Sequence, residues 1–229
     1  MTGTAPVAAI VPLFNGRRYI RDAIESILAQ EPRPSEIVVV DDGSTDGGGE
    51  LLADYPEIRV VPQVNAGEAA ARNRGIRETA APLIAFLDQD DVWLPRKLAL
   101  QVPSLADPAV DIVFAQHRLM VEDGATWFRR DAVDRVLTAE LPGTMIVRRT
   151  AFARIGFYRE DIRLGSDVDW ILRARDAGLG FRLVEEILLL RRMHRTNASI
   201  DEAAFMSGLL RAARASVRRK QSTRGRDER

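Results

Sequence analysis

The stretch Leu83-Ile84-Ala85-Phe86-Leu87-Asp88-Gln89-Asp90-Asp91 joins five apolar residues to three carboxylates within four positions. Its apolar part is typical of a β-strand buried on both faces, so the acidic part follows the end of that strand. Carboxylates this close repel one another, and a divalent cation relieves the repulsion. Oxygen-only ligands favour Mg²⁺ or Mn²⁺, which keep open positions for phosphate oxygens. The stretch therefore predicts a strand ending at a metal site; the alternative is that Asp90 or Asp91 caps a helix beginning near Pro95.

Three other β-rich stretches precede this one, and helix-like segments lie between them. We expect strands at 7–11, 37–40 and 58–61, and helices at 19–28, around 51–52 after a Ser44 or Thr45 cap, and at 68–79. The alternation predicts an α/β fold with a mostly parallel, Rossmann-like central sheet flanked by helices. Right-handed crossovers place the loops after these strands at one edge of the sheet, where ligands bind.

The chain beyond residue 100 has a less regular pattern, with strand-like runs at 112–114, 144–147, 181–184 and 187–190 and helix-like runs at 151–155 and 168–177. Neither an internal repeat nor a low-complexity linker separates the two halves, so we expect one domain over residues 1–200 with a mixed second half. Residues 201–229 form a basic tail, predicted to be helical and to fray after Lys220. Its arginines are Arg211, Arg214, Arg218, Arg219, Arg224, Arg226 and Arg229.

The composition is ordinary for a folded protein, with 46% hydrophobic and 29% charged residues. Lys+Arg and Asp+Glu number 33 each, which gives no global reason to expect a nucleic-acid or membrane partner. The tail can hold the chain at an anionic membrane surface, although a solvated helix end is the preferred interpretation. The absence of cysteine excludes disulfides and thiolate metal sites. Because residues 1–6 lack a secretory pattern and no apolar run approaches about 20 residues, we expect a cytoplasmic protein.

Three further segments at the predicted edge carry groups suited to a nucleotide. Asp41 and Asp42 end the second strand, where a carboxylate can accept hydrogen bonds from a uracil N–H or a ribose hydroxyl, although such sequences also form turns. Pro12-Leu13-Phe14-Asn15-Gly16 predicts a loop that lies against a planar base, or an ordinary βα loop. Asn65–Gly75 supplies small residues, and Arg72 in this segment offers a planar guanidinium to phosphate unless it lies on a solvated helix face.

In their order and spacing, these four segments resemble glycosyltransferase family 2 over roughly residues 7–199. The resemblance implies a GT-A fold, in which one α/β domain binds a nucleoside-diphosphate sugar with Mn²⁺ or Mg²⁺. It also implies a nucleotide-binding half at about 5–100 and an acceptor half at about 101–200. Asp90 would be the direct metal ligand, and Asp88 would face the ribose or reach the metal through water. The implied donor-binding residues are Pro12, Phe14, Asn15, Asp41, Asp42, Gly67, Arg72, Asp88, Gln89 and Asp90.

Two later segments fit the same resemblance. Gly165-Ser166-Asp167-Val168-Asp169-Trp170 occupies the place of the family's acidic pair, so Asp167 is the candidate base of an inverting transfer, with Asp169 in reserve. Ser166 departs from the family, in which glutamate is frequent at this place. In Arg191–Ser199, His194 is the candidate third metal ligand beside Asp88 and Asp90, although a lone histidine is more often structural. Its neighbours Arg191, Arg192 and Arg195 are candidates for offsetting phosphate charge.

Processive synthases that resemble this chain add membrane-spanning helices and a glutamine/arginine/tryptophan motif, neither of which occurs in the sequence, so we expect transfer of one sugar. UDP is the first choice of nucleotide and dTDP is the alternative. The acceptor is not identified; a lipid-linked saccharide is one candidate, and cell-surface polysaccharide, glycolipid and secondary-metabolite glycosylation are the candidate settings. Dehydrogenases and methyltransferases are disfavoured because no G-x-G-x-x-G loop follows the first strand, and P-loop enzymes because no Gly-Lys-Ser/Thr occurs. A sugar nucleotidyltransferase and a catalytically inert nucleotide-sugar-binding module stay as alternatives.

Overall fold

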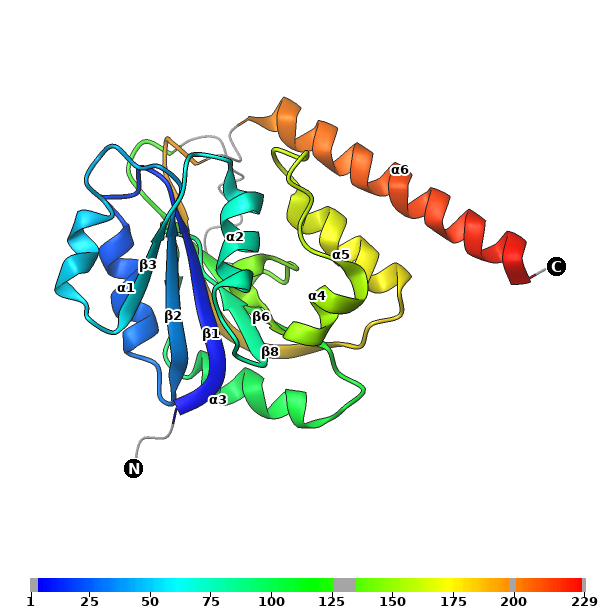
Figure 1. Cartoon of the computed structure of the whole chain (residues 1–229), viewed down its shortest axis with the longest axis horizontal. Coiled ribbons are helices and arrows are strands. Elements are labelled where there is room, and N and C mark those ends of the chain that lie inside the picture. Colours follow the sequence, from blue (N-terminus) through cyan, green and yellow to red (C-terminus); the bar gives the residue numbers. More distant parts are fainter. Residues whose placement is uncertain (1–3, 126–134, 198–200, 228–229) are drawn as a thin grey trace.

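The computed structural model describes residues 4–125, 135–197 and 201–227. Its centre is a sheet with the strand order β3-β2-β1-β4-β7-β6-β8-β5. The first four neighbours in this order, β3 (Ile58–Pro62), β2 (Arg33–Asp41), β1 (Thr4–Leu13) and β4 (Leu83–Phe86), are parallel. Their carboxyl ends therefore lie at one edge of the sheet, at the top of Figure 1. The predicted Rossmann-like α/β fold is confirmed.

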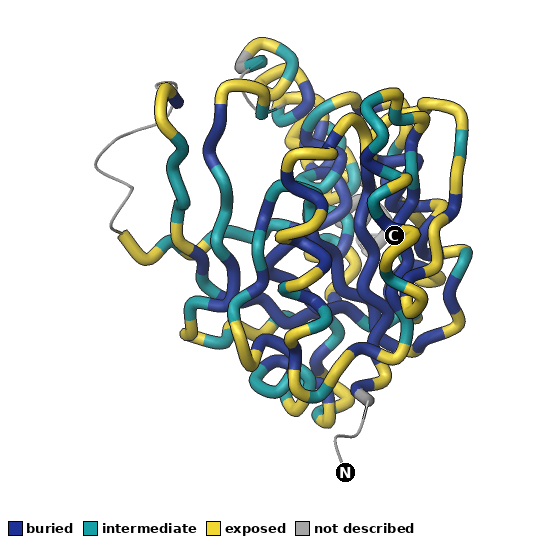
Figure 2. Tube along the Cα trace, turned by 90° about the vertical axis from the view of Figure 1, so that its left-hand side faces the viewer, coloured by how far each residue is buried: buried dark blue, intermediate teal, exposed yellow. Residues whose placement is uncertain are grey.

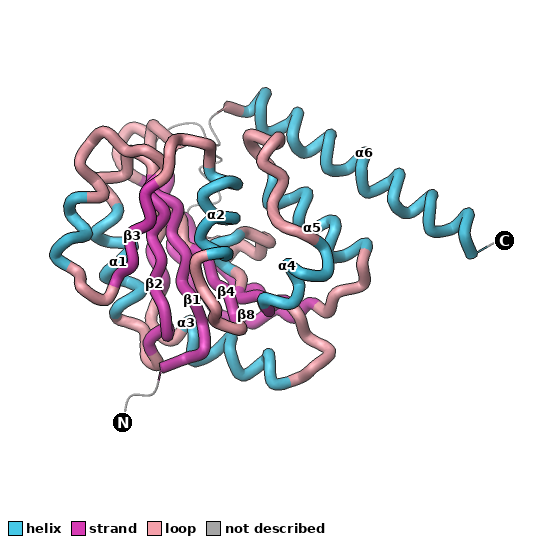
Figure 3. Tube along the Cα trace, in the orientation of Figure 1, coloured by secondary structure: helices cyan, strands magenta, loops and turns pink. Residues whose placement is uncertain are grey.

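Alternate residues of β1 are buried on opposite faces of the sheet, as expected for a strand covered on both sides. Val7 and Val11 pack with α1 (Ile20–Leu28) and α3 (Lys97–Gln101), whereas Ile10 packs with the helices of the other face. These are α2 (Glu68–Arg77), α4 (Arg149–Ile155) and α5 (Ser166–Asp176). Figure 2 shows that the buried residues concentrate in the sheet, and Figure 3 shows the helices arranged around it.

The second half of the chain extends the same sheet. β7 (Ile146–Arg148) lies antiparallel to both β4 and β6 (Ile112–Val121), β6 is parallel to β8 (Phe181–Met193), and β5 (Val92–Trp93) pairs antiparallel with β8. The prediction of two strands at 181–190 is wrong, because β8 is continuous. Its register with β6 shifts between Val184 and Ile187, so the acidic pair Glu185-Glu186 is accommodated without ending the strand.

Two local predictions also differ from the structure. A 3₁₀ helix, η1 (Glu50–Asp54), follows Gly49 without a side-chain cap, because the Ser44 hydroxyl accepts a hydrogen bond from the Asn15 N–H instead. Two other short 3₁₀ helices, η2 (Val102–Ala106) and η4 (Pro142–Thr144), connect strands. α3 begins at Lys97 rather than at Pro95.

The basic tail is a single helix, α6 (Glu202–Asp227), which packs along α5 (Figure 1). It continues past Lys220, where fraying was predicted. Just before this point, Ser216 and Arg219 bind Asp176 of α5 and so attach the helix to α5. None of the helices in the described ranges is long and apolar enough to span a bilayer.

Candidate active site

Gln89 connects the acidic loop after β4 to the loop after β1. Its side-chain oxygen accepts a hydrogen bond from the Phe14 N–H at 2.8 Å, and its side-chain amide donates to the Phe14 carbonyl at 3.1 Å. The Phe14 ring itself is 46% exposed and so presents a flat apolar surface at the sheet edge. Pro12 is buried within β1, where it pairs with Val40. It therefore shapes the loop that follows but does not line its surface.

Asn15 connects the loop after β1 to the loop after β2. It has a left-handed backbone, with φ of 50°, and its side-chain oxygen accepts a hydrogen bond from the Thr45 N–H at 2.9 Å. An asparagine tolerates this conformation better than most residues because its short side chain bonds locally. The contact fixes the position of Asp41 and its neighbours relative to Phe14.

Asp41 and Asp42 have different structural environments. Asp42 is buried, and its carboxylate accepts hydrogen bonds from the Gln63 side chain at 2.7 Å and from the N–H groups of Ala66 and Gly67 at 2.8 and 2.9 Å. Asp42 therefore orders the loop before α2, in which Gly67 has a positive φ of 91°. Asp41 is half-buried and is the member of the pair that retains access to the edge.

Arg72 lies inside the protein rather than on a solvated helix face, since only 3% of its side chain is exposed. Its guanidinium forms ion pairs with Glu68, one helical turn earlier, and with Asp88 at 2.7 Å. The guanidinium also lies over the ring of Tyr158, 5.8 Å from its centroid. These carboxylates raise the pKa of Arg72 against the opposing effect of burial, so it keeps its charge and fixes the orientation of Asp88.

Asp167 lies at this same cluster, although it comes from the first turn of α5. Desolvation raises the pKa of Glu68 most, Arg72 opposes this, and Asp88, Asp167 and Asp90 raise it further. Carboxylates from the end of β4 and from α5 therefore lie near enough to Glu68 to act on its charge. Asp169 does not belong to this group: it is fully buried and accepts a hydrogen bond from Arg173 at 2.8 Å, so only Asp167 is left as the base candidate.

Asp90 contacts the segment that follows β8. Its Oδ2 lies 2.9 Å from Nε2 of His194 and accepts a hydrogen bond from the Asn197 side chain at 3.2 Å. The His194 ring stacks on Tyr19, with 4.6 Å between ring centroids. Two of the three predicted metal ligands are thus adjacent. The third, Asp88, directs a carboxylate oxygen at Arg72.

The donor set fits a divalent metal that takes only part of its coordination shell from the protein. Nowhere in the described ranges do three His, Cys, Asp or Glu side chains form a metal-binding group. Mg²⁺ usually binds one or two carboxylates and completes its octahedron with substrate phosphates and water. Asp90 and His194 would supply two such protein ligands, and an imidazole ligand would favour Mn²⁺ over Mg²⁺.

Asp91 joins the acidic loop to β8 and does not cap a helix, so this prediction is wrong. It is buried, and its carboxylate accepts a hydrogen bond from the backbone N–H of Arg192 at 2.8 Å. Burial raises its pKa, and the neighbouring charges of Asp90 and Asp88 add to this effect.

Arg192 is largely buried and lies in an ion-pair network. It pairs with Asp22 at 2.7 Å and with Glu122 at 3.3 Å, and its Nε donates to the backbone carbonyl of Asp90 at 2.8 Å. Arg192 therefore holds the backbone of the acidic loop in place. Arg195 is exposed and donates to the carbonyl of Gly124, and Ser199 lies outside the described residues.

Several residues of this site were not predicted from the sequence. Tyr19 is part of an apolar helical pattern, which gives no sign that its ring supports His194. Asn197 lies in the same segment as His194, but an asparagine there does not by itself predict contact with Asp90. Glu68 was detectable in principle, because it precedes Arg72 by four residues on the same helix.

The sequence profile of glycosyl transferase family 2 matches residues 8–168, well over half of the chain and all of these segments except the one containing His194. The chain belongs to glycosyltransferase family 2. It is similar to TuaG of Bacillus subtilis, a teichuronic acid biosynthesis glycosyltransferase by name, with 36% identity over 130 residues that cover 54% of this chain and 52% of TuaG. It is also similar to the uncharacterized glycosyltransferase YibD of Escherichia coli, with 28% identity over 223 residues that cover 87% of this chain and 64% of YibD. The chain therefore spans less than two thirds of the length of either relative.

The family assignment agrees with the solved structures that the fold resembles. S. aureus TarS in complex with UDP-GlcNAc superposes with a TM-score of 0.68 and 19% sequence identity, over 83% of this chain and 59% of the TarS chain. TarS in complex with UDP gives a TM-score of 0.66 at 20% identity. At these identities the likeness establishes the fold, which is the GT-A arrangement that the sequence predicted.

Proposed function

We propose that this chain transfers one sugar from a nucleoside-diphosphate sugar to an acceptor hydroxyl, with inversion at the anomeric carbon. The geometry at the end of β4 carries the proposal: Asp88 pairs with Arg72 and Asp90 contacts His194. Asp167 at the start of α5 lies near enough to this cluster to act on the charge of Glu68. Donor-side carboxylates and a candidate base therefore lie near one another. An inverting transfer needs this combination, because the base and the leaving diphosphate act on opposite sides of the sugar.

The donor is assigned to the edge formed by the loops after β1, β2 and β4. The exposed Phe14 ring suits a planar base, Asp41 suits a uracil N–H or a ribose hydroxyl, and Asp88 suits the ribose. UDP is the preferred nucleotide, with dTDP as the alternative, and UDP complexes of the structurally similar TarS support that order. The name of TuaG supports a role in cell-surface polysaccharide assembly, and a lipid-linked saccharide is one candidate acceptor.

Asp90 and His194 would hold Mn²⁺ or Mg²⁺ against the diphosphate. When bound, the ion supplies positive charge that stabilises the departing diphosphate. Arg72 orients the Asp88 carboxylate, and Arg192 holds the backbone of Asp90. Asp167 accepts the proton of the acceptor hydroxyl. At the same time the acceptor oxygen bonds to the anomeric carbon, and the bond from that carbon to the diphosphate breaks.

Release of nucleotide from a panel of UDP-, dTDP- and GDP-sugars, with Mn²⁺ and without it, tests the proposal. We expect Mn²⁺-dependent release of UDP, enhanced by a suitable acceptor and lost in Asp90→Asn. Formation of a nucleotide sugar from a sugar phosphate and a nucleoside triphosphate would instead establish a nucleotidyltransferase. Donor binding without release or transfer across all acceptors would establish an inert binding module.

A further inference from the structure

One face of α6 is buried against the body of the protein, and the opposite face is not. Gly208, Ala212 and Ser216, spaced four residues apart, are buried towards α5 and the loop before it. A side chain at Gly208 would lie within 1.9 Å of the Leu164 carbonyl, so the helix and this loop are in close contact. Figure 1 shows α6 running along α5 and projecting beyond it.

The outward face of α6 carries an apolar stripe. Met206, Leu210 and Val217 are 49%, 50% and 54% exposed, and their spacing of four and seven residues puts them on one side of the helix. Large apolar side chains on a single unpartnered stripe are costly in water, because each leaves apolar area unburied. The described residues provide no element that covers them.

The helix is also strongly cationic. Between Ala203 and Arg226 the sequence contains seven Arg or Lys residues and no Asp or Glu. Some of these cations are neutralised, since Arg211 pairs with Asp161 and Arg219 with Asp176. Arg214 and Arg218, beside the apolar stripe, form no ion pair within the described part of the chain.

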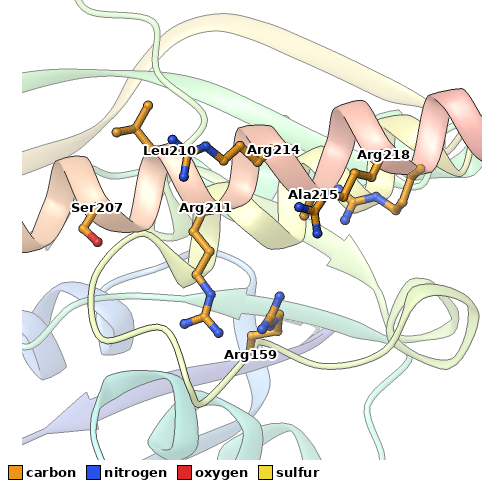
Figure 4. A pocket seen from close by; sticks show the side chains of 8 residues that line it. Arg159, Ser207, Leu210, Arg211, Arg214, Ala215 and Arg218 are labelled. Carbon is orange, nitrogen blue, oxygen red and sulfur yellow. The ribbon is translucent and has the colours of Figure 1, made fainter.

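A groove of about 680 Å³ continues this cationic surface towards the body of the protein. Arg211, Arg214 and Arg218 line it from α6 and Arg159 from the opposite side, as Figure 4 shows. Its other lining residues include Ser207 and Leu210, so hydrogen-bonding and apolar groups accompany the charges. Because Arg159 and Arg211 both pair with Asp161, Arg214 and Arg218 supply the charge that a phosphate group attached to an apolar chain would meet.

We propose that the outward face of α6 docks on a membrane surface rich in anionic phospholipids. Arginines at headgroup level with apolar side chains inserted beside them are the pattern of an interfacial helix. A soluble polyanion would satisfy Arg214 and Arg218 but leave Leu210 and Val217 in water. A second copy of the chain would bring the same arginines against one another, which is unfavourable.

The docking would hold the candidate active site close to the lipid. Gly165, two residues before Asp167, packs against the backbone of Gly208 and Leu209 in α6. The start of α5 is therefore anchored to the helix that meets the membrane. This inference does not depend on which reaction the site performs.

Sedimentation of the full chain with vesicles tests the proposal. We expect binding to phosphatidylcholine vesicles that contain phosphatidylglycerol, little binding to phosphatidylcholine alone, and weakening at high salt. The double variants Arg214→Gln/Arg218→Gln and Leu210→Ser/Val217→Ser should each weaken binding by about tenfold or more. Arg21→Gln/Arg33→Gln, which removes two exposed arginines from α1 and β2, is the matched control and should bind like the parent.

Three results would overturn the proposal. The first is binding that is absent, or equal on neutral and anionic vesicles. The second is binding that inorganic polyphosphate competes for and that survives Leu210→Ser/Val217→Ser, which would identify a free polyanion as the ligand. The third is a dimer in sedimentation velocity that the Leu210→Ser/Val217→Ser variant dissociates, which would identify a second copy. Circular dichroism of each variant checks that the helix is retained.

Discussion

The imidazole Nε2 of His194 lies 2.9 Å from the Oδ2 atom of Asp90, although 104 positions separate them in the sequence. The contact depends on β5 pairing with β8 and on the hydrogen bond from the Arg192 N–H to Asp91. Tyr19 supports the imidazole from the α1 side. One carboxylate and one imidazole are thereby held at the end of β4, where the diphosphate of a donor would lie.

Asp90→Asn tests this pair, because it preserves shape and removes the negative charge that attracts a divalent ion. We expect Mn²⁺-dependent binding of UDP to weaken by about tenfold to a hundredfold, while the small binding measured in EDTA stays unchanged. Isothermal titration with Mn²⁺ or EDTA provides the measurement. The remote carboxylate variant Asp161→Asn should match the parent, and parental affinity in Asp90→Asn would contradict the assignment.

Asp167→Asn separates the proton acceptor from the donor site. Loss of a general base typically lowers the rate by about 10²- to 10⁴-fold, so we expect kcat to fall in this range while UDP affinity is retained. Asp169→Asn is the matched comparison, because Asp169 pairs with Arg173 inside α5. It should lower the melting temperature and spare kcat of the folded fraction; the opposite pattern in the two variants would reassign the base.

Gln89→Ala tests whether the acidic loop holds the base-binding loop in place. Removing two hydrogen bonds to the Phe14 backbone should weaken UDP binding several-fold, at about 0.5–1.5 kcal/mol for each bond. Gly16→Ala should weaken it more, because a side chain there would lie 2.4 Å from the Gln89 side-chain oxygen. In the double variant the Gly16→Ala effect should shrink, since the obstructing side chain is gone. Strictly additive effects would show that the two residues act separately.

Lys97 gives the stability of the protein a distinctive pH dependence. It is fully buried in α3, with Nζ 2.6 Å from the Gln101 side-chain oxygen, and desolvation lowers its pKa to about 7. In the unfolded chain the pKa of a lysine is about 10.4. Between these values the unfolded state binds a proton that the folded state lacks, so the free energy of unfolding rises with pH by about 1.4 kcal/mol per unit. Below pH of about 7 both states carry the proton and this contribution no longer changes.

Lys97→Met should therefore reduce the rise in unfolding free energy between neutral and alkaline pH, as measured by urea unfolding across this range. Lys220→Met removes the only other lysine, which is exposed, and should keep the parental slope. Equal slopes in all three proteins would show that Lys97 is protonated in the folded state.

The parallel half of the fold could be predicted because its strands are buried on both faces and thus form uninterrupted apolar runs. Ile37 to Val40 and Leu83 to Leu87 have no other simple interpretation, and the loops after them necessarily share an edge. The second half depends on register, which a sequence pattern does not encode. Glu185-Glu186 suggests a break, yet the shift between β6 and β8 accommodates it.

The candidate site was predictable where residue type and position both carry information. Asp88 and Asp90 follow a buried strand, and such carboxylates need a charge partner. The difference between Asp41 and Asp42 was not predictable, because it arises when the loop before α2 folds back onto one of two identical side chains. The support of His194 by Tyr19 likewise exists only after α1 and β8 meet.

β8 has a consequence for engineering donor preference. The acidic loop is held on one side by Gln89 and on the other by Asp91, which binds the backbone of β8. Residues 5–100 therefore contain the loops that we propose to face the nucleotide, but they do not form a transplantable module. A chimera of two family members that exchanges this portion must also carry the matching β8 and the His194 that follows it. Otherwise the grafted loops will lack the strand that shapes them.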